Sequence, residues 1–356
     1  MAEKTHISNL IKKAYETHSL SLDECTEILK SKSCDNELFE FANLARIKFS
    51  KESVHLKALI EISNYCKNSC FYCGLRKQNR NVKRYKLTKE QILSTAKEAV
   101  NLGYKTIVLQ SGESRVYSTS EMCEIISSIH NFGARVTLSL GEKSFDEYKA
   151  YKEAGANRYL LRIETTDANL YSKLHPKMSH KNRFLALENL QKLGYETGSG
   201  MIVGFPCQDE RMIAKDILYF KEQNFDMIGV GPFIPCENTP LANFKTDSFL
   251  LSLKAMAIIR LLMPEINIPA TTAMETLCQN GRTMALQSGA NVVMPAVAEY
   301  EYRKDYLIYP NKVTQNCALK EQILEVSSEV LKAGFSISDN HGDSVFFENK
   351  QRKVYE

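Results

Sequence analysis

Short apolar runs rich in β-branched residues alternate along most of the chain with longer segments that have helical periodicity. The runs lie at residues 55–63, 105–112, 134–141, 157–165, 196–206, 226–235, 266–274 and 290–297. Helical patterns such as residues 88–103 lie between them, and several end in a glycine, as helices commonly do. Because nearly continuous apolar strands separated by helices form parallel sheets, the pattern predicts an α/β fold.

The number of these units favours a closed barrel. Eight strand-and-helix units make a (β/α)8 barrel of the TIM type, and an open doubly wound sheet is the alternative. The first fifty residues instead have helical spacing, with Ser21 and Glu24 placed as a capping box. We therefore expect an N-terminal helical extension at 1–50, the barrel at 51–316, and a C-terminal segment packed on the barrel at 317–356.

Composition narrows the setting of this fold. Hydrophobic residues make up 44% of the 356 residues and charged residues 25%, which is typical of soluble globular proteins. The net charge of +4 is too small to argue for nucleic acid. No apolar run is long enough to span a bilayer, and the first residues lack the apolar core of a signal peptide. We therefore expect a cytoplasmic protein that binds neither nucleic acid nor membrane.

Three cysteines lie close together directly after the first predicted strand. Cys66, Cys70 and Cys73 form a C-x3-C-x2-C pattern on a loop at the carboxyl end of that strand, where barrel enzymes place their active sites. The next cysteine and histidine, Cys123 and His130, are distant in sequence. A structural zinc site takes four ligands, whereas a [4Fe-4S] cluster with one iron free of protein ligands suits three thiolates. A zinc site and ordinary buried cysteines remain alternatives.

These residues resemble a known superfamily. With Tyr72 before the third cysteine, the pattern resembles the signature of radical S-adenosylmethionine (SAM) enzymes. Segments over most of the chain, among them "TIVLQSGE", "RYLLRIETT" and "IPATTAM", resemble the HydE family of [FeFe]-hydrogenase maturases. Methylornithine synthase and, more distantly, biotin synthase are the related families.

The resemblance implies a specific chemistry. Cys66, Cys70 and Cys73 would hold a [4Fe-4S] cluster whose open iron binds SAM, and one electron would cleave SAM to methionine and a 5′-deoxyadenosyl radical. The resemblance also implies a small carboxylate-bearing substrate, derived from cysteine and bound to iron. Its implied partners are an external one-electron reductant of ferredoxin or flavodoxin type and other hydrogenase maturases.

The residues that the resemblance assigns to SAM follow the strand ends. Gly112 allows close backbone approach, and Glu113 is an acceptor for an ammonium group. By resemblance Ser139 lies near the nucleoside, Glu164 holds the ribose hydroxyls and Arg183 grips a carboxylate. The predicted cofactor set is Tyr72, Gln110, Gly112, Glu113, Ser139, Glu164, Arg183 and Met201. For Met201, core filling is an equally good account.

A second set is assigned to the substrate. Arg162 shares a strand face with Glu164, because side chains two apart on a strand point the same way. A guanidinium fork suits a carboxylate, although a surface salt bridge is the alternative role. The predicted substrate set is Thr137, Arg162, Thr271, Thr272, Tyr302, Arg303 and Tyr306, with Arg162 and Tyr306 as the catalytic candidates.

Two features depart from the family pattern. Ile163 stands where the family usually has histidine, and an apolar side chain neither donates a hydrogen bond nor binds a metal. A related radical enzyme acting on an amino acid, in the manner of methylornithine synthase, therefore stays open, as does a non-catalytic iron–sulfur carrier. Cys207, Cys236 and Cys278 each follow a predicted strand. They are either unrelated small residues or an additional thiolate site for a metal or a substrate.

Overall fold

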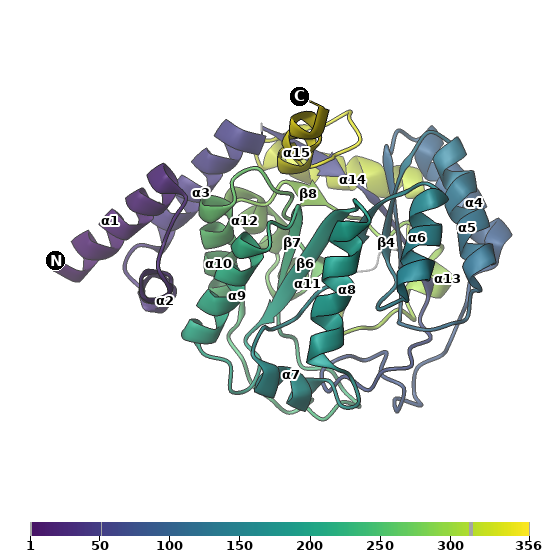
Figure 1. The fold of residues 1–356 in the computed structure, drawn as a ribbon, viewed down its shortest axis with the longest axis horizontal. Helices are drawn as coiled ribbons and strands as arrows, with labels where there is room; N and C mark the ends of the chain where they lie inside the picture. Colours follow the sequence, from purple (N-terminus) through teal and green to yellow (C-terminus); the bar gives the residue numbers. More distant parts are fainter. Residues whose placement is uncertain (1, 51, 313–315, 356) are drawn as a thin grey trace.

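The computed structural model describes residues 2–50, 52–312 and 316–355, and a parallel sheet lies at its centre (Figure 1). Six strands pair in the order β2-β3-β4-β5-β6-β7, and a second sheet has the order β8-β1-β9. The strands are β1 (Ser53–Leu56), β2 (Ala58–Ser63), β3 (Thr106–Ser111), β4 (Arg135–Ser139), β5 (Ala156–Leu160), β6 (Glu196–Val203), β7 (Met227–Pro232), β8 (Val292–Val293) and β9 (Ser336–Ile337).

Helices precede, separate and follow these strands. They are α1 (Ala2–Thr17), α2 (Leu22–Lys30), α3 (Asp35–Ser50), α4 (Lys89–Asn101), α5 (Thr119–Asn131), α6 (Phe145–Glu153), α7 (Ala168–Leu174), α8 (His180–Lys192), α9 (Glu210–Glu222), α10 (Phe249–Leu262), α11 (Thr272–Leu277), α12 (Gly281–Gln287), α13 (Tyr300–Arg303), α14 (Leu319–Lys332) and α15 (Val345–Tyr355). The predicted capping box at Ser21 and Glu24 is present at the start of α2. The glycines that follow α4 and α8, Gly103 and Gly194, have the positive φ expected of helix ends.

Backbone bridges close the six-stranded sheet into a ring. Met227 of β7 bridges Asn267, Pro269 bridges Val292 of β8, and Leu59 of β2 bridges Ala296. The predicted (β/α)8 barrel of the TIM type is therefore confirmed. The predicted strand at 266–274 is wrong in detail, because this segment forms only isolated bridges and helix α11 begins at Thr272. Pro269 has no N–H to donate to a continuous ladder.

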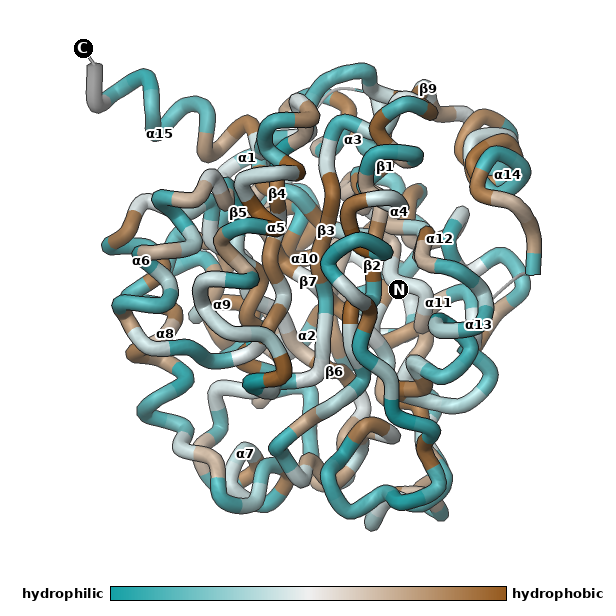
Figure 2. The backbone as a smooth tube through the Cα atoms, turned by 90° about the vertical axis from the view of Figure 1, so that its right-hand side faces the viewer, coloured by the Kyte–Doolittle hydropathy of each residue, from teal (hydrophilic) through white to brown (hydrophobic). Residues whose placement is uncertain are grey.

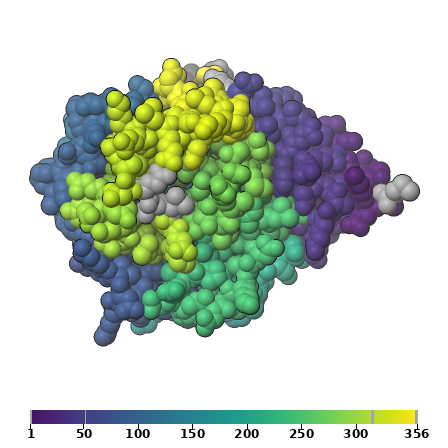
Figure 3. Space-filling view, turned by 180° about the vertical axis from the view of Figure 1, so that it is seen from behind, coloured from purple at the N-terminus to yellow at the C-terminus, as the bar shows by residue number. Residues whose placement is uncertain are grey.

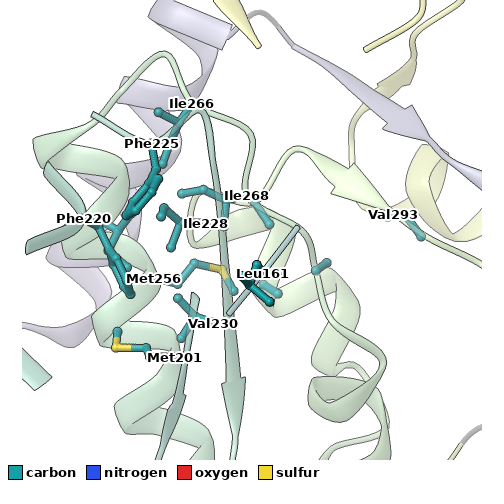
Figure 4. Packing of buried hydrophobic residues seen from close by; sticks show 14 of the residues in the cluster. Leu161, Met201, Phe220, Phe225, Ile228, Val230, Met256, Ile266, Ile268 and Val293 are labelled. Atoms are coloured by element: carbon teal, nitrogen blue, oxygen red, sulfur yellow. The ribbon is translucent and has the colours of Figure 1, made fainter. Parts of the chain in front are cut away.

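The barrel has two distinct ends. The long loop after β2 and helix α7 lie at the carboxyl ends of the strands, at the bottom of Figure 1, whereas α15 lies at the opposite end. The apolar strands run through the centre of the molecule (Figure 2). Core side chains such as Phe220, Ile228 and Met256 fill the layer between the sheet and its helices (Figure 4).

The C-terminal residues close the amino-terminal end of the barrel. Arg158 of β5 is fully buried, and it pairs with Glu196 of β6 and with Asp343. Lys57 donates a hydrogen bond of 2.9 Å to the carbonyl oxygen of Gly342. The C-terminal segment lies across one face of the molecule, and the N-terminal helices project at one side (Figure 3). The domain boundaries at residues 50 and 316 stay predictions. Within the described ranges, no helix is both long enough and apolar enough to cross a membrane.

Candidate active site

The three clustered cysteines lie on the loop between β2 and α4, at the carboxyl end of the barrel. This loop is fastened to its neighbours by backbone hydrogen bonds. Lys67 N donates to the carbonyl of Glu113 at 2.7 Å, Phe71 N to Leu174 at 2.9 Å, and Gly74 N to Ile308 at 2.9 Å. The loop therefore has a defined course although it contains no helix and no strand of the sheet.

One arginine connects several backbone positions of the same loop. The Arg84 guanidinium donates to four backbone carbonyl oxygens, those of Asn64, Leu75, Arg76 and Asn79, at 2.6–3.2 Å. A planar fork of five donors suits such a set of acceptors better than an ammonium does. Arg84 was not among the predicted site residues, since a lone arginine in a loop gives no sequence signal.

The thiols of Cys66, Cys70 and Cys73 share one poorly solvated environment. Burial raises the pKa of each, to about 12 for Cys70, and the negative charge of neighbouring thiolates raises the pKa of Cys70 and Cys73 further. Bound iron supplies the positive charge that three adjacent thiolates lack, so this donor set fits a [4Fe-4S] cluster. Within the described residues, no three His, Cys, Asp or Glu side chains form a group that could hold a single metal ion.

An acidic side chain beside the cysteine loop is held by cations. Glu113 follows β3 and is 8% exposed; its carboxylate lies 2.9 Å from Lys67 Nζ and 3.9 Å from Arg183 Nη2. It also accepts a hydrogen bond of 2.9 Å from the backbone N–H of Glu142. Arg183 additionally donates to the Glu142 carboxylate at 2.6 Å and to the carbonyl of Arg162 at 2.7 Å. The Arg183 fork is thus directed at the protein's own oxygens, and it positions Glu113 and Glu142.

Glu164 has an unusual backbone conformation. Its φ of +66° lies in the left-handed region, which is uncommon for residues other than glycine. Hydrogen bonds to β6 hold it there, since Glu164 N donates to Gly200 at 3.0 Å and its carbonyl accepts from Ile202 at 3.4 Å. Its Oε2 atom is buried without a hydrogen bond and lies 3.1 Å from Arg162 Nη2. A strained residue that presents an unsatisfied carboxylate oxygen to a cavity suits a ligand with hydroxyl donors.

Tyr72 is fixed by a histidine that the sequence did not identify. The Tyr72 hydroxyl lies 2.8 Å from His175 Nε2, and His175 Nδ1 lies 3.0 Å from the carbonyl of Tyr171. Since a carbonyl only accepts, Nδ1 donates to it, and Nε2 of the neutral ring accepts from Tyr72. Burial lowers the pKa of His175 to about 3, which keeps the ring neutral. The Tyr72 ring is therefore locked between the second and third cysteines.

Most of the predicted residues meet at one cavity of about 340 Å³. It opens beside the cysteine loop, and its walls come from the carboxyl ends of the strands. The predicted residues that line it are Cys70, Tyr72, Cys73, Gln110, Glu113, Ser139, Arg162, Glu164, Arg183, Thr271 and Thr272. Cys66 is half-buried on the same loop. The alternation of strand side chains explains the agreement, because Gln110 pairs in register with Ser139 on the inner face.

Gly112 acts through its backbone. A Cβ atom at this position would lie 2.4 Å from the carbonyl oxygen of Tyr65 and 2.9 Å from Cys66 Cβ. The cysteine loop therefore packs directly against the end of β3, and only glycine leaves room for it.

Three predicted or discussed side chains do not reach the cavity. Met201 is fully buried in the core beside Val230 (Figure 4), and its neighbour Ile202 lines the cavity instead. The structure thus favours core filling over a contact with adenine. Thr137 is buried two residues before Ser139 along β4 and does not line the cavity. Ile163 belongs to the hydrophobic core, so its side chain does not face the cavity at all.

Tyr302, Arg303 and Tyr306, which were predicted to bind the substrate, lie behind the cavity wall. Tyr302 accepts a hydrogen bond of 2.7 Å from Gln91, and Arg303 donates to the carbonyl of Ala296 at 2.7 Å. Tyr306 is 2% exposed, and none of these three residues lines the cavity. Their assignment to the substrate gains no support from the geometry. The neighbouring residue Tyr309 does line the cavity.

The structure adds a buried ion pair that the sequence did not predict. Lys312 lines the cavity and pairs with Glu61 on the inner face of β2. A glutamate within the apolar strand "ALIEIS" was the available signal, since a buried charge demands a partner. Its partner, 251 positions away, could not be identified from the sequence.

The three cysteines that follow later strands are in unlike environments. Cys207 is exposed, Cys236 is buried and Cys278 is partly exposed. A Cβ atom on Gly74 would lie 2.9 Å from Cys236 Sγ, so Cys236 packs behind the cysteine loop. Their unlike burial gives no support to a shared thiolate site.

Comparisons with known proteins agree with this geometry. The model of the Radical SAM superfamily matches residues 60–220. The chain is 47% identical over 285 residues to the "[FeFe] hydrogenase maturase subunit HydE" of Thermotoga maritima, covering 80% of this chain and 82% of that protein. It is 32% identical to a 3-methylornithine synthase of Methanosarcina acetivorans, over 79% of this chain and 81% of that protein.

A solved structure shares the fold over nearly the whole chain. The crystal structure of methylornithine synthase (PylB) superimposes with a TM-score of 0.79 at 27% identity, and covers 92% of this chain and 97% of that chain. The matched part includes the barrel and the strand ends that carry the cavity residues. The chain is therefore a radical SAM enzyme and belongs to the HydE family.

Proposed function

We propose that this protein is a HydE-type maturase that cleaves SAM reductively and uses the radical on a small substrate inside the barrel. The family's cofactors are a [4Fe-4S] cluster and SAM, and together they supply a 5′-deoxyadenosyl radical after one-electron reduction. The observation that carries the proposal is the single cavity that collects Cys70, Cys73, Glu113 and Glu164 at the strand ends.

Different residues of the chain have different roles at this cavity. Cys66, Cys70 and Cys73 would hold the cluster, and Glu113 offers a carboxylate to the SAM ammonium group. The buried Oε2 atom of Glu164, which is paired with Arg162 but makes no hydrogen bond, can accept one from the ribose. Because strand ends of the barrel line the cavity, it would position the reacting atoms at contact distance and limit their access to solvent.

The substrate that we propose is a small, carboxylate-bearing molecule, a cysteine-bound iron species with carbonyl and cyanide ligands. Arg162 supports it: its Nη2 atom is engaged by Glu164 and the carbonyl of Met201, while its Nε atom is buried without a hydrogen bond. In a poorly solvated cavity, a guanidinium is an effective carboxylate anchor. The reductant would be of ferredoxin or flavodoxin type, the other hydrogenase maturases would be partners, and the setting would be cytoplasmic.

A methylornithine-type reaction on an amino acid is the second candidate. The shared fold favours it, and the replacement of the family histidine by Ile163 first suggested it. Since Ile163 points into the core, this replacement does not alter the cavity wall. The structure thus removes the main sequence argument for a different substrate.

Anaerobic reconstitution tests the proposal directly. We expect about four irons per chain, and formation of 5′-deoxyadenosine from SAM when dithionite is added. Replacing Cys66, Cys70 and Cys73 together by Ala should abolish both, whereas Cys123→Ala on α5 should change neither. A triple variant that keeps its iron would show that the cluster is assigned to the wrong residues.

The substrate assignment has its own test. Arg162→Met should raise the KM of the cysteine-bound iron species at least tenfold and change the SAM dissociation constant less than twofold. An equal loss of both affinities would move Arg162 into the cofactor site.

A further inference from the structure

A buried ion pair lies against the cavity, and none of the steps above uses it. Glu61 is 0% exposed, its Oε1 atom is paired with Lys312 Nζ, and its Oε2 atom has no hydrogen-bond partner. Lys312 Nζ also lies 4.9 Å from the centre of the Tyr306 ring. Burying two charges is costly, so such a pair is weak evidence for a purely stabilising role.

The pair lies deeper in the barrel than the cysteine loop. Glu61 precedes that loop along β2 and shares the inner face of the strand with Leu59, which lines the cavity. Lys312 lines the same cavity next to Met294. It also lines a second cavity of about 70 Å³, which borders α14, so Lys312 contributes to the walls of both cavities.

Two of the cationic side chains that line the main cavity, Arg162 and Lys312, differ in shape. Arg162 carries a planar fork, which matches the two oxygens of a carboxylate. Lys312 carries a compact ammonium, which suits a single acceptor atom. Glu61 accounts for one ammonium hydrogen and the face of the Tyr306 ring lies near the group, so a donor remains for a ligand in the cavity that Lys312 lines.

We propose that Lys312, oriented by Glu61, binds a second acceptor of the substrate, distinct from the carboxylate at Arg162. This inference rests on the proposed function, and it assigns the terminal nitrogen of an iron-bound cyanide to the Lys312 ammonium. The carboxylate and the cyanide then fix the substrate at two points, with its sulfur directed toward the cysteine loop. A substrate that lacks the second acceptor binds through Arg162 alone.

The test replaces the pair without leaving a buried charge. The double variant Glu61→Gln/Lys312→Met removes both charges at similar volume, and Lys312→Arg keeps the positive charge. The matched control is Glu301→Gln/Lys304→Met, which removes an exposed ion pair from the same part of the chain. Iron content, SAM affinity and thermal unfolding are measured for every variant, and those of Glu61→Gln/Lys312→Met should match the control.

Three measurements test whether Lys312 binds the substrate. We expect Glu61→Gln/Lys312→Met to raise the KM of the cysteine-bound iron species at least tenfold, with partial rescue in Lys312→Arg. The inhibition constant of free L-cysteine, which has the carboxylate but no cyanide, should stay within twofold, whereas Arg162→Met should raise it. In the infrared spectrum of the bound species, the stretching band of ¹³C-labelled cyanide should lose the shift that the hydrogen bond causes in the wild type.

The outcomes separate this inference from the proposed function. If the wild type does not turn over the iron species, the proposed function fails. If it does, and the double variant keeps the wild-type KM and cyanide band, Lys312 does not bind the substrate. A parallel loss of L-cysteine affinity in the double variant would assign the carboxylate to Lys312 and overturn the proposal as well. If the double variant does not fold, the same measurements on Lys312→Gln replace it.

Discussion

The position of the cysteine loop depends on the absence of a side chain at residue 112. In a Gly112→Ala variant the new Cβ atom would lie 2.4 Å from the Tyr65 carbonyl oxygen and 2.9 Å from Cys66 Cβ. Non-bonded carbon atoms rest at about 3.5–4.0 Å, so the loop has to retreat by roughly 0.6–1 Å. It cannot yield at a flexible tip, because the Gly112 and Lys67 amides tie it to Ser63 and Glu113 at 3.1 Å and 2.7 Å.

A shift of this size should act on catalysis more than on folding. Misplacement of a reacting group by about 1 Å costs on the order of a hundredfold in rate, or about 2.7 kcal/mol of barrier. We therefore expect Gly112→Ala to form 5′-deoxyadenosine about a hundredfold more slowly than the wild type, with incomplete iron loading. The assay is anaerobic, with dithionite as reductant and chromatographic detection of the nucleoside.

A matched glycine separates the two effects. Gly194 follows α8 at a φ of +72°, and a Cβ atom there would meet nothing within 4 Å. Gly194→Ala should lower stability by about 1 kcal/mol through the left-handed backbone alone, and should leave iron content and rate unchanged. If Gly112→Ala binds four irons and reacts at the wild-type rate, the cysteine loop does not need its close contact with β3.

Three further predictions concern other parts of the molecule. Arg158→Met leaves Glu196 and Asp343 without their shared cation, so the free energy of unfolding by urea should fall by about 3–5 kcal/mol; a change below 1 kcal/mol would show that the C-terminal segment is held by other contacts. Because the pKa of His175 is lowered to about 3 in the folded protein, the unfolded chain binds a proton first as the pH falls below 6.5. Stability should then fall by about 2 kcal/mol between pH 6.5 and 5, and His175→Gln should remove that part of the slope. Glu164→Gly relieves a positive φ but removes the carboxylate, so we expect nearly unchanged thermal stability and SAM binding weakened about tenfold or more by calorimetry.

The position of the cysteine loop followed from strand geometry, and most other site residues followed from the family resemblance. Cys66, Cys70 and Cys73 are predicted at the carboxyl end of the barrel because they follow the first strand, whereas the roles of Gln110 and Ser139 are implied by the family resemblance. The capping residues and glycines in the sequence correctly predicted where helices begin and end. These features depend on neighbours within a few positions, which is why the sequence alone could predict them.

The predicted substrate residues that gain no support from the geometry, Tyr302, Arg303 and Tyr306, lie where local periodicity fails. The segment from Tyr302 to Lys312 contains only one short helix, so no period indicates which side chains turn inward. Tyr306 turns into the core behind the wall, whereas Tyr309 and Lys312 reach the cavity. The pairing of Lys312 with Glu61 is a contact over a long stretch of chain, and only the closed barrel brings the two together.

A residue that departs from the family pattern bears on the choice of substrate only if its side chain faces the cavity. Ile163 differs from the family pattern, but it lies on the outer face between two cavity residues, Arg162 and Glu164, and touches the hydrophobic core. An apolar side chain there packs against apolar neighbours, whereas a buried histidine would need a polar partner. The departure is therefore a change in core packing, and it leaves the charges at the cavity intact. They include the ion pairs Arg162 with Glu164 and Lys312 with Glu61, and we propose that the substrate matches both cations.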